Sequence, residues 1–156
     1  QLQLFLDASI RGFAPNHNFI IDFSYKAENN TNSYSYLDLN TYPRGYGTLS
    51  SFNQIATWQV NDHFPIMYPD FGLLGIFYMK RIRGNIFADY AIVDDIISDY
   101  NTFESVGAEM IFDLNFFNFI PMSIGARYSR VGRVDSYYNY NNNPNRFEIF
   151  IPVIRL

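Results

Sequence analysis

The chain has 156 residues, a length that suits one domain, and it lacks cysteine, which excludes a disulfide framework, a thiolate metal site and a cysteine nucleophile. Its formal net charge of −4 argues against a nucleic-acid partner bound through phosphate neutralisation. Aromatic residues make up 19% of the chain and charged residues only 17%, a balance typical of an all-β protein and in particular of a membrane barrel with aromatic girdles.

The first two elements are predicted strands. Apolar and polar residues alternate over residues 2–13 and again over residues 19–26, with a short turn at 14–18 between them. The chain begins within this strand pattern, with no basic start or cleavage site of a signal peptide. We therefore expect a mature or truncated chain, with the remaining strands of the fold upstream or in another chain.

A long polar connection, rich in Asn, Ser and Tyr, follows from residue 27 to about residue 47 and ends in Arg44-Gly45-Tyr46. The arginine offers a forked donor to carboxylates, the glycine permits a turn with positive φ, and the tyrosine ring can pack. This combination suits a loop tip tucked into a polar cavity. An ordinary turn on a surface loop is the alternative.

The rest of the chain alternates between predicted strands and connections. Residues 104–115 give the cleanest alternation, and residues 64–70 are predicted to form a proline-containing turn. The strands expected here cover residues 56–61, 73–91, 104–115, 122–129 and 146–156, which makes about seven in total.

The connections alternate between short turns and longer polar loops, which is typical of outer-membrane barrels. Isolated charges among Gly and Ser on the polar faces resemble the lining of a lumen. We therefore predict an all-β fold, an antiparallel transmembrane β-barrel of which residues 1–156 form the C-terminal portion. A soluble β domain, such as an adhesin, is the alternative on pattern alone.

From the Arg-Gly-Tyr stretch onward, the sequence resembles the C-terminal barrel half of BamA-type proteins of the bacterial surface antigen family, in their Bacteroidetes form. This superfamily assembles or translocates proteins at the outer membrane. Several pieces occur in the family's order, namely Arg44-Gly45-Tyr46, Phe64-Pro65-Ile66, the aromatic-x-Asp-x-small motif in residues 85–91 and the glycine-containing segment 103–115.

The resemblance implies that the loop folds into the lumen, where Arg44 meets the carboxylate of Asp89. A bidentate arginine–carboxylate pair would fix the position of the loop. The family often has a second acidic residue on the strand that ends in Phe-Pro, whereas residues 59–62 here read Gln-Val-Asn-Asp. Glu109 and Asp113 are the candidate substitutes.

The resemblance also assigns the last strand to a weak seam with the first strand, through Phe147, Ile149, Ile151 and Pro152. A proline cannot donate a hydrogen bond to a β-ladder, so Pro152 is expected to weaken pairing at this seam. The alternative is a terminal proline without such a role. The chain ends in Val153-Ile154-Arg155-Leu156, where the family tends to end in an aromatic residue.

The sequence contains no recognisable arrangement of catalytic Ser, His and acidic residues. The two histidines, His17 and His63, lie near expected turns, and neither a Gly-x-Ser-x-Gly elbow nor a phosphate-binding glycine loop occurs. Asp94, Asp95 and Asp99 suit either a cation site or a solvated acidic loop. The tyrosines at 34, 36, 137, 138 and 140 suit either ligand binding or loop packing.

The resulting prediction is an outer-membrane barrel that assists insertion or translocation of other outer-membrane or surface proteins and is not an enzyme. We expect no metal or cofactor and no nucleic acid. The implied partners are outer-membrane lipid, client outer-membrane proteins, and accessory lipoproteins or periplasmic domains. A porin-like channel or a structural scaffold of a surface complex is the alternative function.

Overall fold

The computed structural model describes residues 2–12, 16–27, 42–46, 54–73, 75–94, 101–117, 119–132 and 143–152. Within these residues the chain forms strands and no helix. The strands are β1 (Leu2–Arg11), β2 (Asn18–Ala27), β3 (Gln54–Met67), β4 (Phe71–Leu73), β5 (Phe77–Asp94), β6 (Asn101–Phe116), β7 (Ile120–Val131) and β8 (Asn145–Phe150).

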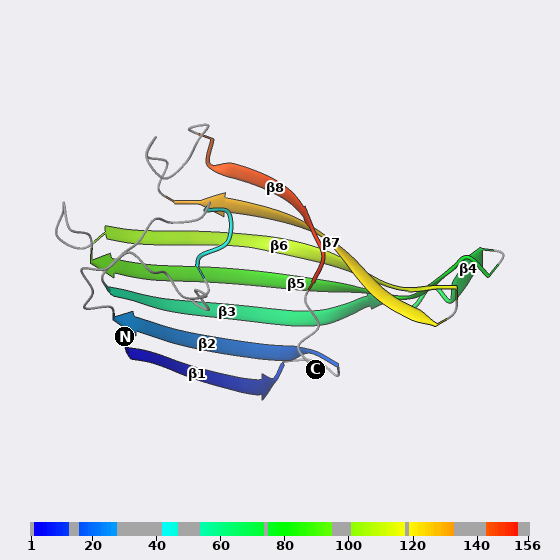
Figure 1. Cartoon of the computed structure of the whole chain (residues 1–156), viewed down its shortest axis with the longest axis horizontal. Helices are drawn as coiled ribbons and strands as arrows, with labels where there is room; N and C mark the ends of the chain where they lie inside the picture. The colour runs from blue at the N-terminus through cyan, green and yellow to red at the C-terminus, as the bar shows by residue number, and fades with distance from the viewer. Residues whose placement is uncertain are drawn as a thin grey trace.

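All eight strands belong to one antiparallel sheet (Figure 1). Seven of them follow the order β1-β2-β3-β5-β6-β7-β8, and the short β4 pairs with β5 beside this path. The predicted all-β antiparallel fold is confirmed. The sheet is not closed, because β1 and β8 form its two edges in the described part of the chain.

The connections between strands lie at two opposite ends of the sheet. Short connections join β1 to β2, β3 through β4 to β5, and β6 to β7 at one end. At that end β5, β6 and β7 extend together with β4 beyond β1, β2, β3 and β8 (Figure 1). The strand ends that are joined from β2 to β3, from β5 to β6 and from β7 to β8 lie at the opposite end (Figure 1).

The predicted turn over residues 64–70 is wrong in its position. Strand β3 continues through Pro65 to Met67, with a shift of register between these two residues against β5. The bends follow later, at Asp70 and Gly75, whose φ angles are 48° and 74°. A three-residue strand such as β4 is too short to produce a periodic pattern, so the predicted strand 73–91 instead begins at Phe77.

The last predicted strand is too long. Strand β8 covers only Asn145–Phe150, and Ile151 and Pro152 follow it instead of lying within it. Residues 153–156 lie outside the described residues. Pro152, two residues beyond the end of β8, lacks the amide hydrogen that a ladder bond needs.

The burial of the two faces of this sheet is the reverse of that in a water-soluble sheet. One face carries polar side chains that are almost fully covered, and Asn85, Asp89 and Ser105 are only 1%, 3% and 2% exposed. The opposite face carries apolar side chains that are open, and Ile86 and Val106 are 57% and 54% exposed. We call the first the polar face and the second the apolar face.

Aromatic rings cover glycines on neighbouring strands of the sheet. Phe64 lies opposite Gly84, Phe87 opposite Gly107, and Phe150 opposite Gly125. A Cβ added to each of these glycines would lie 2.5–2.6 Å from a carbon of the facing ring. Because glycine has no side chain, each ring can lie flat against the backbone of the adjacent strand.

Candidate functional site

Residues 42–46, which we call the tip, lie across the polar face and are fixed at both ends. Near the first end, Gln59 of β3 donates a hydrogen bond from Nε2 to the Tyr42 carbonyl oxygen at 3.4 Å. At the other end, the Tyr46 hydroxyl donates to the Glu104 carbonyl oxygen at 3.0 Å, and its ring meets Phe103 edge-on. The tip thus connects β3 with β6.

Gly45 brings the backbone of the tip close to β7. Its φ is 86°, a left-handed conformation that strongly favours glycine. A Cβ here would lie 2.5 Å from Ser129 Oγ and 3.0 Å from Val131 Cγ1. The glycine of the Arg-Gly-Tyr stretch is therefore required both for the turn and for the close approach to β7.

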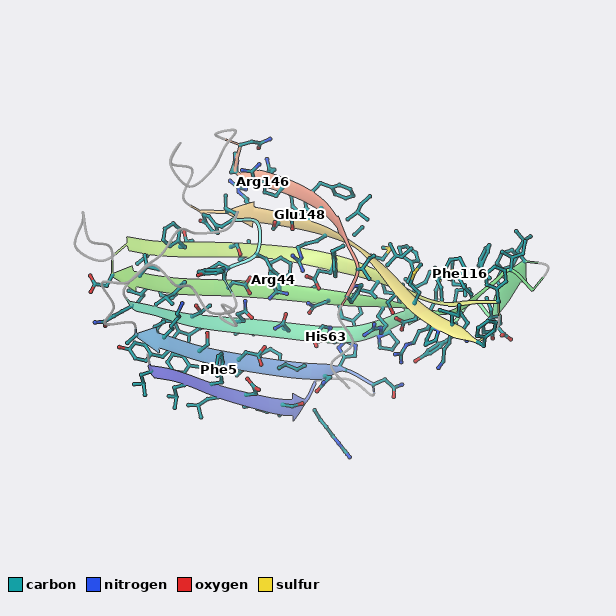
Figure 2. The ribbon with its side chains drawn as sticks, viewed as in Figure 1. Phe5, Arg44, His63, Phe116, Arg146 and Glu148 are labelled. Carbon is teal, nitrogen blue, oxygen red and sulfur yellow. The ribbon has the colours of Figure 1, made fainter. Side chains whose placement is uncertain are left out.

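Arg44, which lies over the middle strands of the sheet (Figure 2), forms a bidentate ion pair with Asp89 of β5. Arg44 Nε donates to Asp89 Oδ2 at 2.8 Å, and Arg44 Nη2 donates to Oδ1 at 2.6 Å. The Arg44 backbone N–H donates to Oδ2 as well, at 2.8 Å. The Asp89 side chain is fully buried. Because it accepts from both the guanidinium and the backbone of Arg44, it holds the side chain and the backbone of the tip in place.

Glu109 is the second acidic residue at the tip. Its Oε1 accepts from Arg44 Nη1 at 3.4 Å and from Arg127 Nε of β7 at 2.6 Å. Its Oε2 accepts from the Asn85 amide at 2.9 Å. Of the two candidate substitutes for the acid missing from β3, the structure places Glu109 against Arg44.

Asp113 lies further along β6 and belongs to a separate cluster. It pairs with Arg81 and Arg83 of β5, and the Ser123 hydroxyl of β7 donates to it at 2.7 Å. None of the contacts among the described residues joins Asp113 to Arg44. The spacing of four residues along β6 explains the separation, because it moves the side chain about 13 Å along the same face.

Phe87 contributes to the site in a way that the sequence analysis did not assign. The Arg44 guanidinium carbon lies 3.7 Å from the centroid of the Phe87 ring, a cation–π arrangement. The same ring covers Gly107 of β6. The guanidinium is therefore held by carboxylates at its edge and by an aromatic ring on its face.

The charged network continues from the tip to the edge strand β8. Arg127 Nη1 donates to Glu148 Oε2 at 3.3 Å, and its guanidinium carbon lies 4.5 Å from the Phe150 ring centroid. Phe147 and Ile149 of β8 are 72% and 75% exposed, on the other side of this strand. Arg127 thus links the tip to β8 through Glu109 and Glu148.

A cavity of about 560 Å³ adjoins the tip on the polar face and is lined by both acidic and basic side chains. His63 lines this cavity together with Asn61 and Arg127, whereas His17 stacks on Phe64 with ring centroids 5.3 Å apart. Across the described ranges, no group of three or more His, Asp and Glu side chains is arranged to hold a metal ion. The arrangement is suited to holding a guanidinium and a chain segment in place.

Two of the sequence-based site predictions concern residues outside the described part of the chain. The Asp95 and Asp99 members of the acidic group lie outside the described residues, as do the tyrosines at 34, 36, 137, 138 and 140.

Comparison with protein-family models, with curated proteins and with solved structures finds no match to this chain. Within the described residues there is no helix with the length and apolar character to cross a membrane.

Proposed function

We propose that the chain is the C-terminal part of an outer-membrane β-barrel of the BamA-like superfamily, which assists insertion or translocation of outer-membrane or surface proteins. The observation that carries this proposal is the reversed burial of the sheet, with the Arg44 tip held against Asp89 on its polar face. A membrane barrel has this distribution, because lipid solvates its outer wall and its inner wall faces a polar lumen.

The extent of the apolar face supports a membrane location over a soluble domain. Large exposed apolar side chains occur on β1, β3, β5, β6, β7 and β8. They include Leu4, Trp58, Ile86, Met110 and Tyr128, each at least 38% exposed. Soluble monomers rarely expose contiguous apolar patches of more than a few hundred Å².

The proposed assembly role rests on the edges and on the tip. Strands β1 and β8 each have one edge that pairs with no other described strand, and an unpaired edge can template an incoming strand. In the complete barrel, β8 would meet a first strand that lies upstream, at a seam weakened by Pro152. Arg44, Asp89 and Glu109 would hold the inner wall in one arrangement while client strands pair at that seam.

Replacing Ile86 with arginine tests the membrane location. Ile86 is in the middle of β5 on the apolar face. If this face contacts lipid, the charge is expected to cost about 2–4 kcal/mol of folding free energy in bilayers. If the face contacts water, a surface change of this kind would shift stability by only about 0.5 kcal/mol or less.

The measurement is denaturant unfolding of the refolded protein in lipid vesicles. Ile76→Arg is the matched control, because Ile76 is also exposed (49%) but lies in the turn before β5. We expect a cost of about 1 kcal/mol or less at that position, near the interface. Equal and small costs for both variants would rule out the proposed location.

Depletion of the protein in its native host separates the proposed role from the alternative. Loss of many unrelated outer-membrane proteins would support assembly or translocation. Loss of uptake of a single solute, with other outer-membrane proteins unchanged, would instead identify a porin-like channel. Loss of one surface complex alone would identify a structural scaffold.

A further inference from the structure

The apolar face contains a groove of about 490 Å³ across β3, β5, β6 and β7. Ala88 of β5 lies in a cross-strand row between Val60 and Val106, so a small side chain separates two larger ones. Trp58 and Tyr90 form one wall of the groove, with ring centroids 5.9 Å apart. These apolar and aromatic walls suit a hydrocarbon chain.

The groove also carries two opposite charges, which are unusual on this face. Glu104 of β6 and Arg130 of β7 both line it, and both are exposed. Arg130 lies opposite Val106, two residues along β6 from Glu104. This diagonal relation separates the two backbones by about 7–8 Å.

Neither charge is neutralised by a protein contact. Across the described ranges, the side chains of Glu104 and Arg130 make no ion pair and no hydrogen bond. An uncompensated charge on a face that contacts lipid is costly unless a polar group of the lipid meets it. The groove therefore presents one cation and one anion beside an apolar channel.

We propose that this groove binds a zwitterionic phospholipid whose head group carries a primary ammonium, such as phosphatidylethanolamine. This inference rests on the proposed function, since it takes the apolar face to be the lipid-facing wall. The acyl chain lies over Ala88 between Trp58 and Val106. The lipid phosphate accepts from the forked donors of Arg130, and the ammonium donates to the Glu104 carboxylate.

The charge pattern selects among lipid classes. A phosphatidylcholine head group keeps the phosphate, but its trimethylammonium has no N–H to donate to Glu104. A phosphatidylglycerol head group has no cation and brings its negative charge towards that carboxylate. Only the primary ammonium satisfies both charges of the groove with hydrogen bonds.

Trp58 provides the probe, because it is the single tryptophan of the sequence and lines the groove. The complete protein, with Trp58 as its only tryptophan, is reconstituted in vesicles that contain a trace of one lipid with brominated acyl chains. Quenching of Trp58 fluorescence reports occupancy. We expect relative binding of brominated phosphatidylethanolamine to exceed that of the choline and glycerol lipids by about tenfold, the ratio for one charge-assisted hydrogen bond.

Two variants and one control complete the test. Glu104→Gln is expected to abolish the preference for ethanolamine over choline, and Arg130→Gln to lower binding of all three lipids. Lys80→Gln, which removes an exposed charge outside the groove, is expected to change neither. Equal quenching by all three lipids would overturn the groove proposal while leaving the membrane location intact. Absence of quenching by any brominated lipid would overturn the membrane location as well.

Discussion

Asp89 is the residue on which the position of the tip most depends. It accepts three hydrogen bonds from Arg44, two from the guanidinium and one from the backbone. We expect Asp89→Asn to release the tip, because removing one charge of a buried ion pair costs about 3 kcal/mol. That cost corresponds to about a 100-fold larger fraction of molecules with the tip displaced.

Limited digestion with trypsin measures this release. The enzyme cuts after arginine, so cleavage of the bond between Arg44 and Gly45 reports exposure of the tip, and mass spectrometry identifies the fragments. Asp113→Asn is the control, since Asp113 contacts Arg81 and Arg83 and not the tip. Similar cleavage of the two variants would contradict the role assigned to Asp89.

Gly107 supports the tip indirectly, through the ring of Phe87. A Cβ at Gly107 would lie 2.6 Å from Phe87 Cζ and 2.1 Å from the Tyr128 carbonyl oxygen. We expect Gly107→Ala to destabilise the protein by about 2 kcal/mol through overpacking. It should also speed tryptic cleavage at Arg44, because the ring that supports the guanidinium must move.

The free energy of unfolding in vesicles checks this second prediction. Gly72→Ala is the matched control, because a Cβ there meets its nearest atom, Tyr78 Cδ2, at an ordinary 3.4 Å. If both alanine variants are equally stable, the packing of Phe87 on Gly107 does not restrain the sheet.

Arg44 was identified from the Arg-Gly-Tyr stretch, and the family resemblance named Asp89 as its partner and Glu109 as one candidate for the second acid. The sequence could not separate Glu109 from Asp113, because that choice depends on where the tip crosses β6. The role of Phe87 was also missed. A ring that lies on a glycine of the next strand is visible only once the register of the two strands is known.

At the scale of elements, β8 is the least secured of the seven strands in the main path. It has six residues and pairs with β7 alone in the described part of the chain. Pro152, two residues beyond its end, cannot donate to a ladder. We expect Pro152→Val to lengthen the strand and to slow amide hydrogen exchange at Ile151 by about tenfold, the equivalent of about 1.4 kcal/mol.

Hydrogen exchange followed by mass spectrometry over residues 145–152 checks this prediction. Amides of β6, which pairs on both sides, serve as the internal reference and should not change. Unchanged exchange at Ile151 in the valine variant would show that Pro152 does not limit pairing at this edge.

The strands themselves were largely predictable, and the ends of the sheet were not. Period-2 alternation located β1, β2, β6 and β7 closely, because each has one apolar and one polar face. Prolines were misleading in β3, where Pro65 lies within the strand at an irregular position of the ladder. Strand β4 depends on pairing with β5 and has no pattern of its own.

At the scale of the whole molecule, the described residues form an open sheet with β1 and β8 at its edges. We propose that β1 pairs with strands upstream in the same polypeptide. The expected result is that the natural polypeptide, extracted in detergent, has an intact mass well above the 18.3 kDa of these 156 residues. A mass near 18.3 kDa would instead mean that strands come from partner chains or that a small barrel closes by itself.

The three ring-on-glycine pairs have a consequence for how sequences of this fold can diverge. Gly84, Gly107 and Gly125 each make room for one ring on a neighbouring strand, and neither member of a pair can change size alone without a clash or a void. Among relatives, the two positions of each pair should covary, so that a larger residue at the glycine accompanies a smaller one at the ring. In an alignment, such paired substitutions would indicate which residues lie opposite each other in β3 and β5, in β5 and β6, and in β7 and β8.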